Sequence, residues 1–167
     1  MFTPSSAAEF AGYHSIYALK KLIAGQFAPQ MAFYGGEDED LIRFMNETTG
    51  RTYEDTIQLF STHQPEGANY GVFITDVPES ARNPNFLAIQ AFDYTKNWHI
   101  SGAISYQNKK LFKPLTFGDP TIIDIQGPGP HDELRTMFNV VNGMKDNPDY
   151  LEVTKGHYKG QPVRNVL

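Results

Sequence analysis

The sequence predicts a single α+β domain, with a mainly antiparallel central sheet and helices at the N-terminal and C-terminal ends of the chain. Helical patterns near both ends flank a central region of short β-rich runs, which are separated by Gly, Pro, Asn and Asp. The 167 residues are enough for one hydrophobic core, and no repeat or low-complexity tract divides them. We therefore expect one globular domain over residues 1–167, with an irregular tail from about residue 155.

The N-terminal helix has clear start and stop signals. Ser5 and Ser6 followed by Glu9 are typical of a capping box, and Gly25 favours a helix end, so the pattern predicts a helix over residues 7–24. Helical spacing predicts that its buried stripe contains Phe10, Tyr13, Tyr17 and Leu22.

Two shorter helices are expected before the first strand. After a loop through Pro29, the acidic residues 37–40 favour the first turn of a helix to about residue 48. Thr52 and Asp55 indicate a second capping box and a short helix to about Phe60.

The central runs predict strands. Residues 71–75 have the β-branched and aromatic content of a buried strand, and Thr75, Asp76 and Pro78 end it. Residues 86–92 fit a short helix or a strand. Residues 98–107 favour a strand in a hairpin with residues 111–117, and a further strand at 121–126 follows a turn at 118–120.

The C-terminal region is predicted to begin with a helix over residues 131–145. Its apolar face would contain Leu134, Met137, Phe138 and Val141. A strand is possible at residues 150–153, and the sequence after it is irregular.

Composition excludes several classes of protein. Without cysteine, the chain has no disulfide, thiolate nucleophile or cysteine zinc site. A net charge of −5 makes nucleic acid an unexpected partner, since Lys109, Lys110 and Lys113 are too few for a basic patch. No apolar run approaches the roughly 20 residues of a membrane span, and no secretory signal is visible. We expect a soluble domain that has no membrane partner and binds a small molecule or a protein.

The polar residues point to few sites. No two of the five histidines have the spacing that places two metal ligands on one helix face, so no metal is expected. Asp124 lies in the apolar run 122–125, where an acid is costly to bury without a partner. Asp124 is therefore the first acid to consider as functional.

Three short segments occur in an order that resembles the His-Tyr-Asp subclass of ADP-ribosyltransferase toxin domains. They are Tyr13-His14, the YGVFITD run at residues 70–76, and the GDP and IIDI runs at 118–120 and 122–125. The resemblance implies a split sheet that clamps NAD. His14 would bond the ribose, Phe73 would stack on nicotinamide, and Asp124 would lie near the reacting ribose.

The resemblance assigns His14 and Asp124 as catalytic candidates and Tyr70, Phe73 and Thr75 as candidates for binding the cofactor, NAD. This chain departs from the family in two respects. Phe73 occupies the family's tyrosine position and cannot donate a hydrogen bond, unless a shifted register lets Tyr70 serve. The family also needs its histidine on a strand, whereas the capping pattern that starts at Ser5 places His14 in a helix.

Two alternatives remain open. The first is a non-catalytic module that binds a protein or small molecule through exposed members of its aromatic residues, which make up 13% of the chain. The second is a metal-independent ribonuclease that uses His157 with Lys155, Lys159 and Arg164. The leading expectation is a small effector-type or ligand-binding domain with a pocket near the edge of the sheet, of which NAD-dependent ADP-ribosyl transfer is the most specific chemical version.

Overall fold

The strands of the protein form one five-stranded antiparallel meander, in the order β1-β2-β3-β4-β5. In the computed structural model, the residues described are 1–36, 50–62, 64–81 and 84–160. The strands are β1 (Gln30–Gly35), β2 (Ala68–Val77), β3 (Phe86–Asp93), β4 (Trp98–Gln107) and β5 (Thr116–Gln126). Each strand pairs with the next along the chain, as tight connections favour in an antiparallel sheet.

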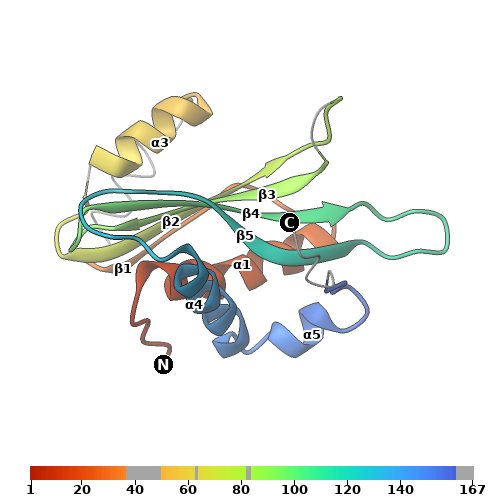
Figure 1. The fold of residues 1–167 in the computed structure, drawn as a ribbon. Helices are drawn as coiled ribbons and strands as arrows, with labels where there is room; N and C mark the ends of the chain where they lie inside the picture. Colours follow the sequence, from red (N-terminus) through yellow and green to blue (C-terminus); the bar gives the residue numbers. More distant parts are fainter. Residues whose placement is uncertain (37–49, 63, 82–83, 161–167) are drawn as a thin grey trace.

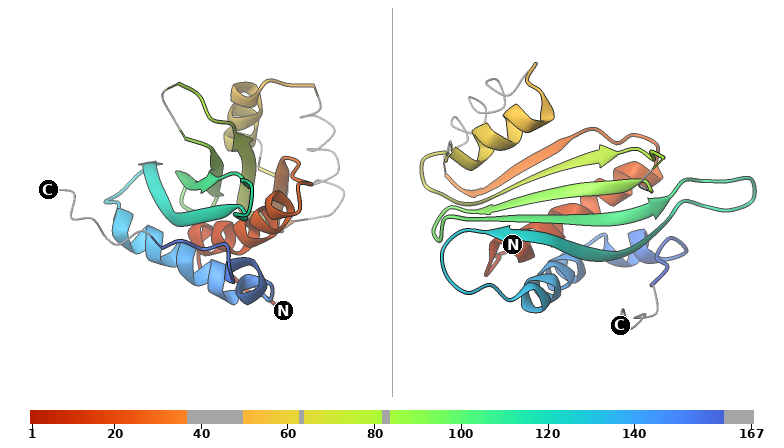
Figure 2. Two further views of the ribbon diagram at one scale, coloured as in Figure 1. Left: turned by 90° about the vertical axis from the view of Figure 1, so that its right-hand side faces the viewer. Right: turned by 45° about the horizontal axis from the view of Figure 1, so that its top comes forward.

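Helices cover both faces of the sheet (Figure 1). Helices α1 (Ala7–Ile23), α4 (Glu133–Asp146) and α5 (Tyr150–Thr154) lie on one face, and α3 (Tyr53–Thr62) lies on the other. The two views of Figure 2 show the same arrangement, with α1 and α4 beneath the strands. The fold is therefore the predicted α+β domain, with helices at both ends of the chain.

Side chains alternate between the two faces of the sheet. On the face toward α1 and α4, the inner face, Ile74, Leu87, Ile89 and Ile104 are buried in the main core. On the opposite face, the outer face, Phe73 and Phe92 pack with Phe60 of α3 in a second cluster. Phe60 has no exposed surface, so α3 is fixed to the sheet mainly by aromatic contact.

The N-cap hydrogen bond of each expected capping box is present among the described residues. Ser6 accepts a hydrogen bond from the Glu9 N–H at 3.1 Å, and Thr52 accepts one from the Asp55 N–H at 3.2 Å. The helix expected after residue 37 lies outside the described residues. Residues 86–93 form a strand, which settles the choice between helix and strand.

Four element predictions are wrong. The predicted strand at 111–117 is mostly loop, because β5 begins only at Thr116. Residues 30–35, predicted as part of a loop, form β1 and pair with β2. The predicted turn at 118–120 is instead inside β5, where Pro120 is tolerated because an edge strand needs hydrogen bonds on one side only. Residues 150–154 form the helix α5 in place of a strand, and this places Val153 in the core.

The predicted buried stripes also need correction. Helix α1 buries mainly small residues with Phe10, Ile16 and Leu19, while Tyr13 and Tyr17 are only partly buried. Helix α4 buries Val140, Gly143 and Met144, whereas Leu134 and Phe138 are 60% and 56% exposed. The physical reason is that α4 packs against α1 as well as against the sheet. A close contact between two helices needs small side chains on the facing side, so Gly143 lies there and the larger Leu134 and Phe138 do not.

Two glycines let α1 and α4 touch backbone to backbone. A Cβ atom at Gly12 would overlap the carbonyl oxygen of Val140, and one at Gly143 would overlap the carbonyl oxygen of Glu9. One turn farther along both helices, the Asn147 side-chain amide donates to the carbonyl of Tyr13 at 2.7 Å. From the contact of Glu9 with Gly143 to the bond of Tyr13 with Asn147, the position advances by four residues on both helices, so the two helices run in the same general direction.

Gly12→Ala should lower the free energy of unfolding by about 3 kcal/mol, the upper end of the usual range for overpacking, because the added methyl meets backbone that cannot move aside. Asn142→Ala is the matched control, since Asn142 is exposed on α4 and should change stability little. Urea unfolding of both variants measures the difference. Equal stability of Gly12→Ala and the wild-type protein would contradict the close helix contact.

Candidate ligand cavity at the helix N-termini

A cavity of about 480 Å³ lies where the N-terminal ends of α1 and α4 meet the turn between β3 and β4. This volume is within the range of small-molecule sites. We call it the N-terminal cavity. Its lining comes from three distant parts of the chain and consists of Ser5, Ser6, Ala7, Ala8, Asp93, Lys96, Trp98, Ile100, Pro130, Asp132, Arg135, Thr136 and Asn139.

Parallel packing explains why both helix starts reach this cavity. Helices α1 and α4 run in the same direction, so their N-terminal turns lie at the same end of the pair. The first N–H groups of a helix have no partner within the helix, and the helix dipole makes that end positive. The N-terminal cavity therefore has two such ends on its wall, in addition to its charged side chains.

The acids of the cavity are occupied by backbone hydrogen bonds. Asp93 is buried, and its Oδ1 accepts from the Thr95 N–H at 3.0 Å, the Thr95 hydroxyl at 2.6 Å and the Lys96 N–H at 3.1 Å. Asp132 caps α4, where its Oδ1 accepts from the Arg135 N–H at 3.0 Å. These carboxylates thus fix the β3–β4 turn and the start of α4.

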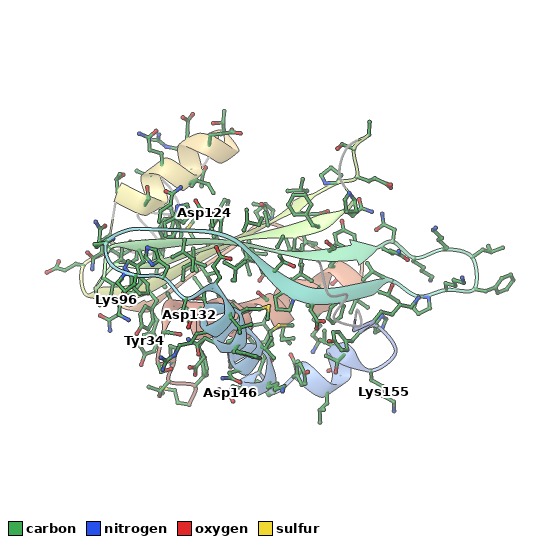
Figure 3. The ribbon with its side chains drawn as sticks, viewed as in Figure 1. Tyr34, Lys96, Asp124, Asp132, Asp146 and Lys155 are labelled. Carbon is green, nitrogen blue, oxygen red and sulfur yellow. The ribbon has the colours of Figure 1, made fainter. Side chains whose placement is uncertain are left out.

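The cations of the cavity are not held by acids. Among the described residues, the ion pairs both involve Lys20, which bonds Asp149 and Glu152. Lys96 and Arg135 are exposed and lie outside these pairs. Figure 3 shows Lys96 and Asp132 at the same end of the molecule, beside the start of α4. A ligand in the cavity would therefore meet two cations whose charges are available.

Trp98 is a rigid aromatic part of this wall. Its indole N–H donates to the Pro128 carbonyl at 2.7 Å, and the His131 ring meets it edge-on at a centroid distance of 5.0 Å. The Lys96 ammonium lies 4.7 Å from the Trp98 ring centroid. With Ala8 and Ile100, Trp98 gives the cavity an apolar part next to its cations.

Two of the predicted site residues lie on the α1 side of the sheet. His14 contacts Phe10 edge-on at 4.5 Å between ring centroids, and burial lowers its pKa to about 4. Tyr70 lies 6.5 Å from the same Phe10 ring, and its hydroxyl donates to the carbonyl of Ser5 at 3.3 Å. Tyr70 therefore borders the N-terminal cavity through Ser5, while His14 is part of an aromatic group with Phe10, Tyr13 and Tyr17.

The other three predicted residues lie on the outer face. Phe73 packs against Phe60, Thr75 follows it on the same strand face, and Asp124 is opposite Ser101 in β4. Asp124 is exposed and accepts a hydrogen bond from the Gln126 amide at 2.9 Å. The Thr75 hydroxyl is buried without a hydrogen-bond partner among the described residues. The structure thus separates Asp124 from His14 by the thickness of the sheet.

A polar group that sequence reasoning missed lies on the outer face near Asp124. The His99 Nε2 and the Ser101 hydroxyl both bond the side-chain oxygen of Gln90, at 2.5 and 2.8 Å. His99 also stacks on Phe92, with ring centroids 4.4 Å apart. Burial lowers the pKa of His99, and the negative charge of Asp124 partly opposes this shift. These groups satisfy one another, so they are less available to a ligand than Lys96 and Arg135.

The cavity residues also were not selected from the sequence, because no short motif contains them. Their one local signal was the pair of N-cap patterns, Ser6 before α1 and Asp132 before α4.

Within the described residues, no group of three or more histidines and carboxylates is placed to hold a metal ion. No described helix combines the length and apolar character needed to cross a membrane.

The lowered pKa of His14 predicts a loss of stability in mild acid. Between pH 6.5 and about 4 the unfolded state binds a proton that the folded state excludes, so the free energy of unfolding falls as the pH falls. From pH 7 to pH 5 this contribution is about 2 kcal/mol. His14→Leu should lose less stability over this range than the wild-type protein, as measured by urea unfolding at each pH.

Tyr17→Phe is the control for this measurement, because it changes the same aromatic group but removes no group that titrates in acid. It should keep the wild-type pH dependence. Identical pH dependence of His14→Leu and the wild-type protein would mean that His14 is protonated in the folded state as easily as in the unfolded state.

Comparison with known proteins adds no further assignment. The chain matches no family model, no curated protein and no solved structure. A proposal of function therefore rests on the N-terminal cavity, its available cations and the converging starts of α1 and α4.

Proposed function

We propose that this protein is a ligand-binding domain that takes a small organic anion in the N-terminal cavity. The observation that carries the proposal is the convergence of Lys96, Arg135 and two helix N-termini on one cavity of about 480 Å³. Asp93 and Asp132 in its wall keep their charges, but each has an oxygen bonded to backbone N–H groups, whereas Lys96 and Arg135 lie outside the ion pairs of the described residues. The cavity lies at one end of the interior strands β3 and β4, beside the turn that joins them.

The chemistry of the wall narrows the class of ligand. Helix N-termini and an arginine suit phosphate or carboxylate groups, since both present several N–H donors to oxygen atoms. Trp98, Ile100 and Ala8 offer apolar contact next to these donors. A ligand with an anionic group and a flat or apolar part fits both features. NAD has this character through its pyrophosphate and its rings, and it is therefore the first probe.

ADP-ribosyl transfer is a more demanding proposal. It needs a histidine and an acid at one NAD molecule, whereas His14 lies on the α1 side and Asp124 on the outer face. This separation favours binding without transfer.

Binding should be visible as thermal stabilisation. We expect millimolar sodium pyrophosphate and NAD to raise the unfolding temperature, because they bind only the native state. The rise should be about 2–4 °C for each kcal/mol by which the bound ligand stabilises the native state. Nicotinamide, which lacks a phosphate, should give no shift. Arg135→Ala and Lys96→Ala should each reduce the shift, because each removes one of the available cations of the cavity.

Lys145→Ala is the matched control, since Lys145 is an exposed cation in the last turn of the same helix α4 and lies outside the cavity lining. It should keep the full shift. A shift that survives in both cavity variants, or that Lys145→Ala also loses, would place the anion somewhere other than the N-terminal cavity.

A second measurement separates binding from transfer. Incubation of the protein with NAD and a lysate of candidate targets should release no nicotinamide above the background, because His14 and Asp124 do not face one cavity. Asp124→Ala should behave like the wild-type protein in both assays. Nicotinamide release that Asp124→Ala abolishes would instead support ADP-ribosyl transfer. The thermal shift with the cavity variants would still decide separately whether the anion binds in the N-terminal cavity.

A further inference from the structure

The loop between β4 and β5 extends beyond the sheet (Figure 1). Its tip carries two exposed apolar side chains. Leu111 is 86% exposed and Phe112 is 98% exposed. Reciprocal backbone hydrogen bonds between Lys110 and Lys113, at 3.0 and 2.9 Å, close a tight turn with Leu111 and Phe112 as its central residues. The turn therefore directs both apolar side chains away from the domain.

The backbone at this turn makes its sequence unusual. Phe112 has φ +64°, in the left-handed region where turns favour Gly or Asn and where a bulky residue is rare. An exposed phenylalanine in that conformation adds neither burial nor backbone preference to the stability of the fold. A local conflict of this kind is a reason to look for a role of Phe112 outside the stability of the fold.

Lysines surround the base of the tip. Lys110, Lys113 and Lys159 line a cavity of about 270 Å³, whose lining contains no carboxylate. Lys159 comes from the C-terminal segment and is held there because its N–H donates to the carbonyl of Phe117 at 2.9 Å. Lys109 is the neighbour of Lys110 in sequence, and Lys155 lies at the end of α5 on the same side of the molecule (Figure 3).

This combination fits one kind of partner. We propose that the β4–β5 tip docks the domain on a bilayer that carries anionic lipids, with Leu111 and Phe112 in the interfacial region and the lysines on the headgroups. Apolar residues flanked by basic ones are the pattern of interfacial anchors, and the lysines complement anionic headgroups in a chain whose net charge is −5. A narrow projection can insert into a bilayer, whereas a stable protein interface needs a broader surface.

The docking surface is independent of the proposed ligand. It lies at the end of β4 opposite Trp98, and it shares no residue with the N-terminal cavity. It also differs from the expectation of no membrane partner, which was based on the absence of a spanning segment. Within the described residues there is no helix that could span a bilayer, and insertion of the tip requires none.

Vesicle sedimentation tests the proposal. The wild-type protein should sediment with phosphatidylcholine vesicles that contain phosphatidylserine, should bind pure phosphatidylcholine vesicles at least about tenfold less, and should dissociate as salt increases. The double variant Leu111→Ser, Phe112→Ser and the double variant Lys110→Glu, Lys113→Glu should each lose most of the binding. Phe138→Ser and Lys145→Glu, which alter exposed residues of α4, should bind like the wild-type protein.

Phe112→Gly separates docking from folding. Glycine accepts the positive φ without strain, so this variant should keep or raise the unfolding temperature while it loses vesicle binding. Failure of the wild-type protein to bind anionic vesicles, or full binding by the tip variants, would overturn the proposal. Binding of polyglutamate without binding of anionic vesicles would overturn it as well, and would assign the lysines to an acidic protein.

Discussion

The backbone contact between α1 and α4 is the constraint on which the rest of the structure depends. Gly12 and Gly143 remove the side chains that would hold the two helices apart, so each helix meets the other's carbonyl oxygens. Parallel helices side by side place like ends of their dipoles together, which is unfavourable. Close packing and the hydrogen bond from Asn147 to Tyr13 offset this cost. The same geometry brings two positive helix ends to one place, where the cavity lies.

The two faces of the sheet are used in different ways. The inner face is buried by aliphatic residues under α1 and α4, and it positions the strand ends that form the N-terminal cavity. The outer face combines an aromatic cluster under α3 with the hydrogen-bonded group of His99, Ser101 and Gln90. Tyr94 connects the turn after β3 to α3, because its hydroxyl donates to the carbonyl of Phe60 at 3.0 Å. Burial raises the pKa of Tyr94, so this hydroxyl remains protonated as a donor.

Local signals predicted much of the fold, and contacts between distant residues account for what they missed. Ser6 and Thr52 each accept a hydrogen bond within one helical turn, so the starts of α1 and α3 were visible in the sequence. The buried face of α4 was not, because periodicity selects Leu134 and Phe138 as large apolar residues whereas the contact with α1 requires a glycine. The cavity joins residues 5–8, 93–100 and 130–139, and no short-range pattern relates such segments. For the same reason, the sequence alone did not show that His14 and Asp124 lie on opposite sides of the sheet.

The length of β4 has an electrostatic consequence. This strand runs from Trp98, at the N-terminal cavity, to Gln107, at the base of the lysine-rich tip. Ten residues of extended chain span about 30 Å. The Debye length at physiological ionic strength is about 8 Å, so the cations of the cavity and the lysines of the tip are separated by several such lengths. An anion bound at the cavity and an anion bound at the tip would therefore repel each other little. The length of β4 keeps the two regions electrostatically independent.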